Sequence, residues 1–373
     1  MTSQNYQQTY NLYFLSDSKI SDTNIPYRIF KLIKVNNPNT FCEFISLNLF
    51  NKEIIRLIKN NLFLIKHHKT IIIHSHHPKS LIINILLKIL LSKVFRRKII
   101  SCHTFHYEKT RFSFIKLIPF ALSKYFIDIY FSVSNEVRKQ WSNYLKKQIY
   151  LSYIGITESE SKIIKRLSIQ KKVEDYKKSH SKIINITWVG RLEEIKRPLF
   201  FLESLNYFKS NKEFSIQVNF IGDGKLRDLV QKKIRNLNKR FEYLNLNINL
   251  NYLGFLERNK IYKIISITNI YICSSASESF CVSALEFITN PYCRIILPNI
   301  KTLKNIYKCR RTKFFNPNDK YDLFSKLNKT IDESIYNKSD LLNDNYPLFF
   351  NELKLDNLAK NYQDIYLSYL QTI

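Results

Sequence analysis

Glycine is scarce in this sequence: only five occur among 373 residues, where ordinary usage gives about 25. Acidic residues are also few, because 59 Lys and Arg face 30 Asp and Glu, which gives a formal net charge of +29. This imbalance does not decide the fold, but it favours an anionic partner such as a phosphorylated ligand, an acidic membrane surface or nucleic acid. The alternative is that abundant Lys only solvates the surface.

Three other features are missing. The six cysteines, at positions 42, 102, 273, 281, 293 and 309, include no pair at CxxC spacing. They predict small buried side chains in a reducing compartment, and neither a disulfide framework nor a zinc site. No cationic start precedes a long apolar run at the N-terminus, so no signal peptide is expected. The longest apolar stretch, 81–95, is too short and too polar to span a bilayer, and we therefore expect a cytoplasmic protein.

What the sequence does contain is an alternation of β-rich runs and helical patterns, which predicts an α/β fold with parallel, doubly wound sheets. Strands are expected at 12–15, 43–47, 70–74, 98–102, 127–133 and 148–153, and then at 183–189, 215–221, 247–253, 269–274 and 294–297. Helices are expected at 79–94, 136–145, 198–208, 225–237, 258–265, 282–288 and 353–370.

The stretch 157–182 is charged and lacks strand-like runs, so it is interpreted as an interdomain linker with some helix. Two Rossmann-like domains are therefore predicted, at 1–156 and 183–350. The final segment, 351–373, is expected to be a helix that packs towards the N-terminal domain. In sheets of this type, ligands bind outside the carboxyl ends of the strands.

All five glycines fall where predicted strands end: Gly155, Gly190, Gly222, Gly224 and Gly254. Glycine allows positive φ and lets a ligand approach the backbone closely, although turns alone also require it. Two cations, Arg191 and Lys196, follow the strand at 183–189. Together they could neutralise a diphosphate, and the alternative is a pair of solvated surface charges.

The most informative segment is SSASESFCVSALE at 274–286, in which Glu278 and Glu286 are separated by seven residues. Glu278 is expected in a loop after a strand, and Glu286 in a helix that begins near Phe280, where free N–H groups would suit phosphate. The plainer interpretation is a helix-start acid at Glu278 and a solvated or salt-bridged acid at Glu286.

Four segments between 183 and 297 occur in a recognisable order: ITWVGRLEEIKRP, NFIGDGKLRDLV, NYLGFL and SSASESFCVSALEF. Their order and spacing resemble the retaining glycosyltransferases of family 4, the group 1 glycosyl transferases with the GT-B fold. The N-terminal half resembles the family more loosely, through IIIHSHHPKS, IISCHTFH, YFSVSNEVRKQW and YLSYIGIT. The resemblance implies two Rossmann-like domains that face each other across a cleft.

The resemblance also implies roles. Arg191 and Lys196 would hold the donor diphosphate, Glu286 the nucleotide ribose, and Glu278 would lie near the donor sugar. His103 would reach the sugar from the N-terminal domain, with His106 as a rival for that role. The loops around the sugar and nucleotide would be formed by Gly190, Gly222, Gly224, Phe280, Cys281 and Val282. No metal is expected, because cations and the helix end offset the charge of the leaving group.

The sequence departs from the family at three places. No glycine occurs in 14–19, where the family often has a glycine-rich loop that contacts the donor phosphate or the acceptor. The family's Asn-Gly after the last N-domain strand is Ile154-Gly155 here, and Asn290-Pro291 stands where the family usually has a glycine.

The histidine cluster 74–77 and 103–106 has no Cys or carboxylate to complete a convincing zinc spacing.

A basic and aromatic stretch at 109–126 is a separate candidate for contact with an anionic membrane. Its cations are Lys109, Arg111, Lys116 and Lys124, and its rings are Phe112, Phe114, Phe120 and Phe126. Ordinary helix packing is the alternative.

These features predict a retaining hexosyltransferase that uses a UDP- or GDP-linked sugar. The expected acceptor is a glycan or lipid-linked oligosaccharide of surface polysaccharide or lipopolysaccharide biosynthesis, at the inner face of the plasma membrane. Two alternatives remain: a catalytically degenerate protein of the same fold that binds anionic partners, and a nucleic-acid binder. The last is disfavoured, because no nucleic-acid motif is present.

Overall fold

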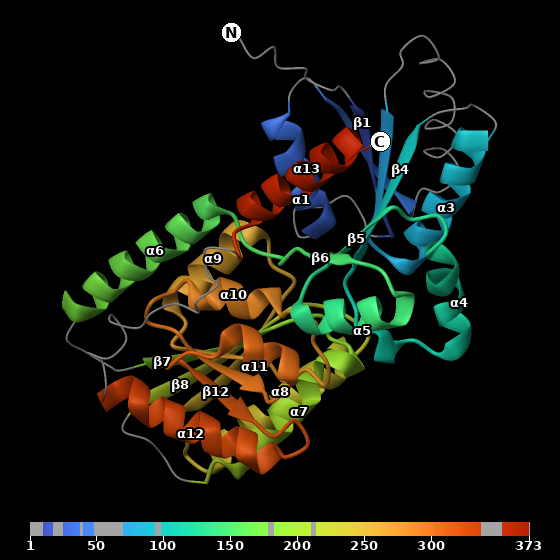
Figure 1. Ribbon diagram of the computed structural model, residues 1–373. Helices are drawn as coiled ribbons and strands as arrows, with labels where there is room; N and C mark the ends of the chain where they lie inside the picture. Colours follow the sequence, from blue (N-terminus) through green and yellow to red (C-terminus); the bar gives the residue numbers. More distant parts are fainter. Residues whose placement is uncertain are drawn as a thin grey trace. The chain divides into compact units, whose positions relative to one another are not determined.

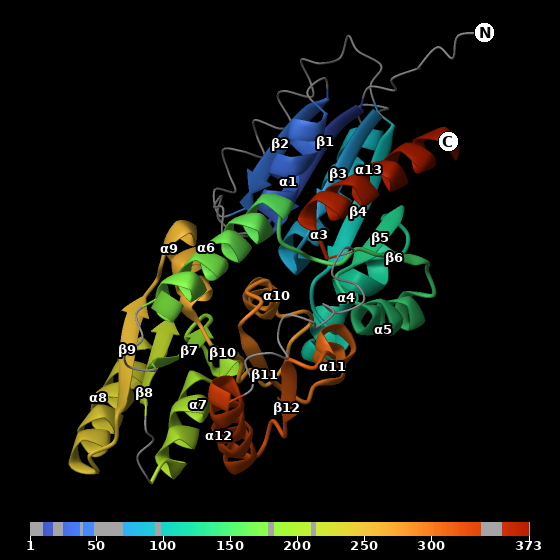
Figure 2. The same cartoon turned by 90° about the vertical axis from the view of Figure 1, so that its left-hand side faces the viewer.

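The computed structural model describes residues 10–17, 25–37, 40–47, 70–93, 98–177, 183–209, 214–336 and 353–372. It separates into two compact units (Figures 1 and 2). The N-terminal unit comprises the chain up to Ile154 together with the segment from Leu355 onward, and the C-terminal unit is Gly155–Lys354. Each unit contains one parallel six-stranded sheet, which confirms the predicted α/β class with two doubly wound sheets.

The sheet of the N-terminal unit has the order β2-β1-β3-β4-β5-β6. Its strands are β1 (Tyr10–Ser16), β2 (Phe41–Ser46), β3 (Thr70–Ser75), β4 (Ile99–Phe105), β5 (Ile129–Ser132) and β6 (Ile149–Leu151). β1 is buried along its whole length, as expected for a central parallel strand covered on both faces. Neighbours in chain order lie on opposite sides of β1, so the sheet has a switch point between β1 and β3.

Alternate residues of these strands enter two cores. Leu12 and Phe14 pack with α1 (Ile25–Asn36) and α13 (Leu355–Thr372), whereas Tyr13 and Leu15 pack against α3 (Pro78–Lys93). Figure 1 shows α13, in red, alongside α1, in blue. The unit is completed by α4 (Phe114–Ser123), α5 (Asn135–Leu145) and the short 3-10 turn η3 (Lys109–Arg111). The last helix is thus a structural part of the first domain.

The sheet of the C-terminal unit has the order β12-β11-β10-β7-β8-β9. Its strands are β7 (Ile183–Val189), β8 (Ser215–Ile221), β9 (Ile248–Gly254), β10 (Ile270–Ile272), β11 (Arg294–Pro298) and β12 (Thr312–Phe315). The chain first builds outward from β7 to β9 and then returns to place β10 on the other side of β7. The carboxyl ends of β7 and β10 therefore flank the switch point, where open α/β sheets bind ligands.

Helices cover both faces of this sheet. A large apolar core lies under α7 (Pro198–Ser204), α8 (Arg227–Tyr243) and α12 (Lys320–Tyr336), with Ile186 and Val218 among its strand residues. The other helices of the unit are α6 (Glu158–Lys177), α9 (Arg258–Ile267), α10 (Val282–Ile288) and α11 (Lys301–Tyr307). The 3-10 turn η4 (Glu194–Lys196) precedes α7, and η5 (Leu205–Tyr207) follows it.

The structure differs from the sequence-based expectations at several elements. The stretch 157–182, interpreted as a linker with some helix, contains the 20-residue helix α6, which contacts α9 inside the C-terminal unit. Residues 178–182 and 337–352 are outside the described part of the chain. A capping box starts this helix: Glu160 Oε2 accepts from the Thr157 N–H at 2.8 Å, and Thr157 Oγ1 accepts from the Glu160 N–H at 3.2 Å. Strand β12 and helices α11 and α12 were not among the predicted elements.

Candidate functional site

Two loops lie side by side at the switch point of the C-terminal sheet. One follows β7 and carries Gly190, Arg191 and Lys196, and the other follows β10 and carries Glu278. Backbone and side-chain hydrogen bonds join them: the Ala276 N–H donates to the Ile195 carbonyl at 2.9 Å, and the Ser274 hydroxyl bonds the Lys196 carbonyl at 3.0 Å. The two loops consequently form one continuous surface. It brings Lys196 and Glu278, which are 82 positions apart in the sequence, into contact.

That contact is a partly buried ion pair. Lys196 Nζ lies 2.5 Å from Glu278 Oε1, and the two side chains are 25% and 9% exposed. Ser275 donates a second hydrogen bond to the same oxygen, at 2.6 Å. Burial opposes the charged amine, but Glu278 and the neighbouring thiols outweigh it and raise the pKa of Lys196 to about 12. Lys196 is therefore a fixed cation at neutral pH.

Arg191 has a different environment. Its guanidinium pairs with Glu193, at 2.8 Å, and 64% of its side chain is exposed. An exposed pair of this kind contributes little to stability, because solvent screens it. Arg191 can therefore exchange Glu193 for another anion at small cost, whereas Lys196 is held in place.

The glycines after β7 and β8 serve backbone packing. Gly222 has a φ of +135°, and a Cβ at this position would lie 1.9 Å from the carbonyl oxygen of Gly190. A Cβ on Gly224 would lie 2.6 Å from the Leu192 carbonyl oxygen. The loops also exchange a hydrogen bond, from the Gly190 N–H to the Ile221 carbonyl at 3.1 Å. Close approach of two loops thus explains these glycines without a ligand.

Glu286, on α10, is held by a residue that the sequence analysis did not identify. Arg258, at the start of α9, places Nη2 2.7 Å from Glu286 Oε1 and Nε 2.7 Å from Glu160 Oε1. Tyr262 adds a hydrogen bond to the same oxygen of Glu160, at 2.6 Å. The three ionic side chains are at most 19% exposed. No local sequence pattern marks Arg258, because its carboxylate partners lie 98 and 28 positions away.

The segment between the two glutamates turns sharply before α10. Phe280 is buried, and Cys281 adopts a left-handed conformation with φ +62°, which non-glycine residues rarely take. The Tyr307 hydroxyl fixes this turn by donating to the Cys281 carbonyl at 2.8 Å. Helix α10 spans Val282–Ile288, as predicted, and has only seven residues.

The hydroxyl of Ser279 is buried and has no hydrogen-bond partner among the described residues. A polar group left in this state costs about 1–3 kcal/mol, and a ligand that bonds it would remove the cost. It was not a candidate in the sequence analysis, since a lone serine carries no signal.

In the N-terminal unit, the histidines gather at the ends of β3 and β4. His103 Nδ1 bonds the Ser75 hydroxyl at 2.9 Å, and His76 Nδ1 lies 3.1 Å from His106 Nε2. Burial lowers the pKa of His103 to about 3, and it also holds the pKa of His76 well below the ordinary value. These imidazoles are neutral at physiological pH and offer hydrogen bonds, not positive charge.

The same histidines line a small pocket with aromatic walls. Its lining includes His76, His77, His103, His106, Phe112 and Trp141. Because His103 and His106 both line it, the structure keeps both as candidates for contact with a sugar.

The loop after β1, which lacks the family's glycines, places the carboxylate of Asp17 at the start of α3. Asp17 accepts hydrogen bonds from the Ser80 and Lys79 N–H groups at the start of α3, at 2.9 Å and 3.3 Å. A carboxylate there satisfies N–H groups that a phosphate would otherwise bind. Residues 18–19 are outside the described part of the chain.

Comparisons with known proteins agree with this architecture. Residues 168–340 match the family described as glycosyl transferases group 1. The sucrose-phosphate synthase of Thermosynechococcus elongatus has a similar structure, with a TM-score of 0.71, 12% identity, and coverage of 98% of this chain and 100% of that one. HepE of Anabaena, solved in complex with UDP, gives a TM-score of 0.66 at 13% identity, over 96% and 100% of the two chains.

A glycosyltransferase of Rickettsia africae is similar over 98% of this chain and 100% of its own, with 16% identity and a TM-score of 0.63. No curated protein sequence matches the chain. At these identities the likeness establishes the GT-B fold, and the family match over residues 168–340 supports a glycosyltransferase of the group 1 type.

Proposed function

We propose that this protein transfers a hexose, with retention, from a nucleoside-diphosphate sugar to a glycan acceptor. The observation that carries the proposal is the partly buried Lys196–Glu278 pair at the switch point of the C-terminal sheet, within the segment that matches the family. An oriented, permanently charged amine beside a carboxylate suits a site where negative charge develops on a leaving diphosphate.

Within this proposal, Lys196 and Arg191 bind the diphosphate. Lys196 supplies a fixed charge, and Arg191 leaves Glu193 to offer its planar fork to a phosphate. Glu278 lies near the donor sugar, and the turn formed by Phe280, Cys281 and Val282 surrounds it.

Glu286 accepts hydrogen bonds from the ribose hydroxyls through Oε2, because Oε1 is already paired with Arg258. Uridine is the favoured base, since HepE was solved with UDP and also with UDP-glucose; guanosine is the alternative.

No metal ion takes part in the proposed transfer, because the two cations offset the charge of the leaving group. With a seven-residue α10, the helix dipole contributes less to this than the side-chain charges do. His103 touches the sugar as a neutral hydrogen-bonding group, and its low pKa supports that form over an imidazolium.

The acceptor is proposed to be a lipid-linked oligosaccharide of surface polysaccharide or lipopolysaccharide biosynthesis. The support is helix α4, whose outward face is apolar: Phe114 is 83% exposed and Ile115 77%. Exposed cations, Arg111, Lys116 and Lys124, surround this face. Such a combination suits an anionic bilayer, with the apolar side chains among the lipids and the cations on the headgroups. Among the described helices, none is both long and apolar enough to cross a membrane.

The experiment is a melting curve of the purified protein with UDP or GDP in the presence of EDTA. A ligand at about 100 times its dissociation constant adds roughly 2.7 kcal/mol to the stability of the folded state, which shifts the curve measurably. UDP should stabilise more than UMP, because UMP lacks the second phosphate.

The double variant Arg191→Ala, Lys196→Ala should abolish the shift, and Lys239→Ala, an exposed cation on α8, should retain it. Pyrophosphate and ATP control for general affinity of a basic protein for phosphates. If pyrophosphate stabilises as well as every nucleoside diphosphate, the nucleotide site is refuted.

A further inference from the structure

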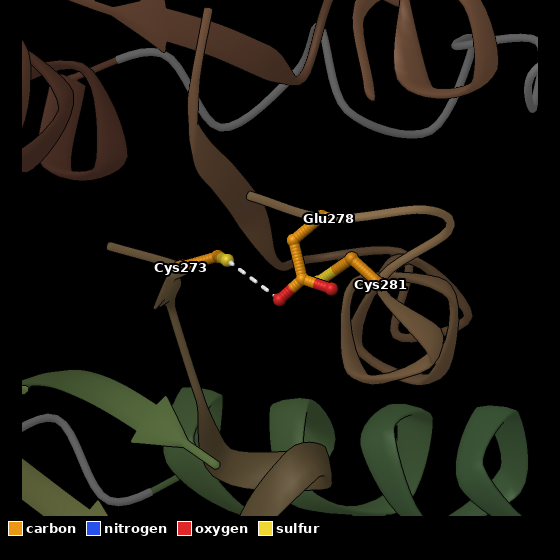
Figure 3. A group of neighbouring side chains, drawn as sticks. All are labelled: Cys273, Glu278 and Cys281. Atoms are coloured by element: carbon orange, nitrogen blue, oxygen red, sulfur yellow. Dashed lines mark hydrogen bonds between the residues drawn. The ribbon is translucent and has the colours of Figure 1, made fainter. Parts of the chain in front are cut away.

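Cys273, Glu278 and Cys281 form a compact group (Figure 3). The Lys196 amine pairs with Glu278 of this group. Cys273 directly follows β10, and Cys281 directly precedes α10. One sulfur from each cysteine and one carboxylate oxygen all lie within 4.8 Å of one another, and the three residues are buried. Figure 3 shows the two thiols and the carboxylate pointing toward a common centre.

The donor set and its spacing fit one class of ion. Thiolate sulfur binds zinc at about 2.3 Å and carboxylate oxygen at about 2.0–2.2 Å, which places tetrahedral ligands roughly 3.3–3.8 Å apart. Cys273 Sγ and Glu278 Oε1 are already 3.9 Å apart. Inward movements of about 1 Å or less would complete three corners of a tetrahedron. Magnesium and calcium are disfavoured, because both prefer oxygen ligands.

The surrounding contacts orient these ligands. Cys281 has a left-handed backbone conformation, which costs a non-glycine residue about 1–2 kcal/mol. Its carbonyl accepts a hydrogen bond from the Tyr307 hydroxyl, and its sulfur lies 3.7 Å from the Tyr271 hydroxyl. Ser275 lies 3.3 Å from Cys273 Sγ and donates to Glu278 at 2.6 Å. Outer partners of this kind fix metal ligands in place.

We propose that Cys273, Glu278 and Cys281 bind one thiophilic divalent cation, Zn²⁺ in the first instance, with its fourth position open. Two thiols lose their protons on binding, and both protons pass to solvent. The two thiolates and the carboxylate then carry three negative charges, and Lys196 and the ion carry three positive charges. The buried site is thus electrically balanced with the ion as well as without it.

The ion and the sugar donor compete for the same carboxylate. This consequence rests on the proposed function, which places Glu278 near the donor sugar. The zinc form would be closed to the donor, and removal of zinc would open the site. The cation therefore acts as an inhibitor at this site and takes no part in sugar transfer.

The test uses the full chain, kept reduced by a phosphine and freed of metal, and titrated with Co²⁺. Thiolates bound to Co²⁺ give an intense near-ultraviolet charge-transfer band, which histidine and carboxylate sites do not. The band should saturate at one ion per chain and disappear when one equivalent of Zn²⁺ is added. No band, or a band that Zn²⁺ leaves in place, would overturn the proposal.

Cys281→Gly is the sharpest variant, because glycine accepts the φ of +62° and the substitution removes the sulfur ligand together with its methylene. It should fold and lose the band. Cys309→Ser, at a partly exposed cysteine outside the cluster, should keep it. A band that survives in Cys281→Gly, or that disappears in Cys309→Ser, would place the metal elsewhere and refute the assignment.

UDP-sugar binding separates this inference from the proposed function. One equivalent of Zn²⁺ should weaken donor binding to the parent protein at least tenfold. Donor binding to Cys281→Gly should be the same with and without Zn²⁺. Equal weakening in both proteins would refute the competition at Glu278. If the protein binds no nucleotide sugar but still gives the Co²⁺ band, the proposed function fails and the metal site stands.

Discussion

Replacing Arg258 by methionine should destabilise the C-terminal unit strongly, because this side chain joins two carboxylates. Both ionic contacts are 2.7 Å long, and the side chains of Arg258, Glu160 and Glu286 are 19%, 13% and 9% exposed. Solvent therefore screens them little. Removing one partner of a buried ion pair costs about 3–5 kcal/mol, since the remaining carboxylate stays buried without its cation. For a unit of 150–250 residues, this lowers the melting temperature by roughly 6–20 °C.

The assay is thermal unfolding followed by calorimetry, with Arg227→Met as the matched control. Arg227 also pairs with one carboxylate, Asp223, but at 3.6 Å and with more than half of its side chain exposed. Its loss should cost less than about 0.5 kcal/mol. Adding Glu286→Gln to Arg258→Met should recover about 1–3 kcal/mol, because the buried charge disappears.

In the parent protein, Glu286→Gln alone should weaken UDP binding by about 1.5–3 kcal/mol, the contribution of charge-assisted hydrogen bonds to the ribose. Equal losses in Arg258→Met and Arg227→Met would refute the argument that the Arg258 network is buried and strongly coupled. Unchanged UDP affinity in Glu286→Gln would remove Glu286 from the donor site.

Three other outcomes are expected. Gly222→Ala should lower the free energy of unfolding by about 3 kcal/mol or more, because the new Cβ would meet the Gly190 carbonyl oxygen. Gly254→Ala has open space around the new Cβ and should cost only the left-handed backbone strain of about 1–2 kcal/mol. Similar denaturation midpoints for the two variants would contradict this. The folded-state pKa of His103 lies near 3 and the unfolded value near 6.5, so the contribution of His103 to stability should be full above pH 6.5 and fall by about 1.4 kcal/mol per pH unit below it. Burial also lowers the pKa of His74, His76 and His106, so the whole protein should lose stability more steeply, and His103→Gln should reduce the slope measured in pH-dependent melting. Binding to anionic vesicles should weaken as salt screens charges beyond about 8 Å, and should weaken further when four cations become Gln; equal binding to neutral vesicles would exclude the membrane surface. The four cations are Lys109, Arg111, Lys116 and Lys124.

The sequence predicts the architecture well where the pattern is local. β7 and β8 have the predicted bounds, because β-branched and aromatic residues recur along each strand and a glycine follows it directly. β12 escaped prediction, since its four residues, TKFF, are too few to show a period. Helix α4 contains Pro119 and leaves apolar residues exposed, so its pattern does not resemble that of a packed helix.

For the candidate site, the sequence identifies residue types but not their partners. Lys196 and Glu278 were both singled out, yet as two neighbours of one ligand and not as an ion pair. Arg258 was missed, because a cation among 59 is distinguished only by carboxylates that the fold brings to it. The cysteine cluster was missed for the same reason: positions 273 and 281 are eight residues apart, and a strand end and a helix start bring their sulfurs together.

The place of α13 has a consequence for how the protein is made. The core of the N-terminal unit includes Leu355 and Tyr362, and a buried hydrogen bond at 2.9 Å joins the Tyr362 hydroxyl to Thr104. These residues leave the ribosome only after all of Gly155–Lys354 has been synthesised. The C-terminal unit is continuous in sequence and has all its strands by then. We therefore expect the C-terminal unit to be able to fold before the N-terminal unit is complete, against the usual N-terminal-first order. Until translation reaches α13, α1 alone covers this face of the first sheet.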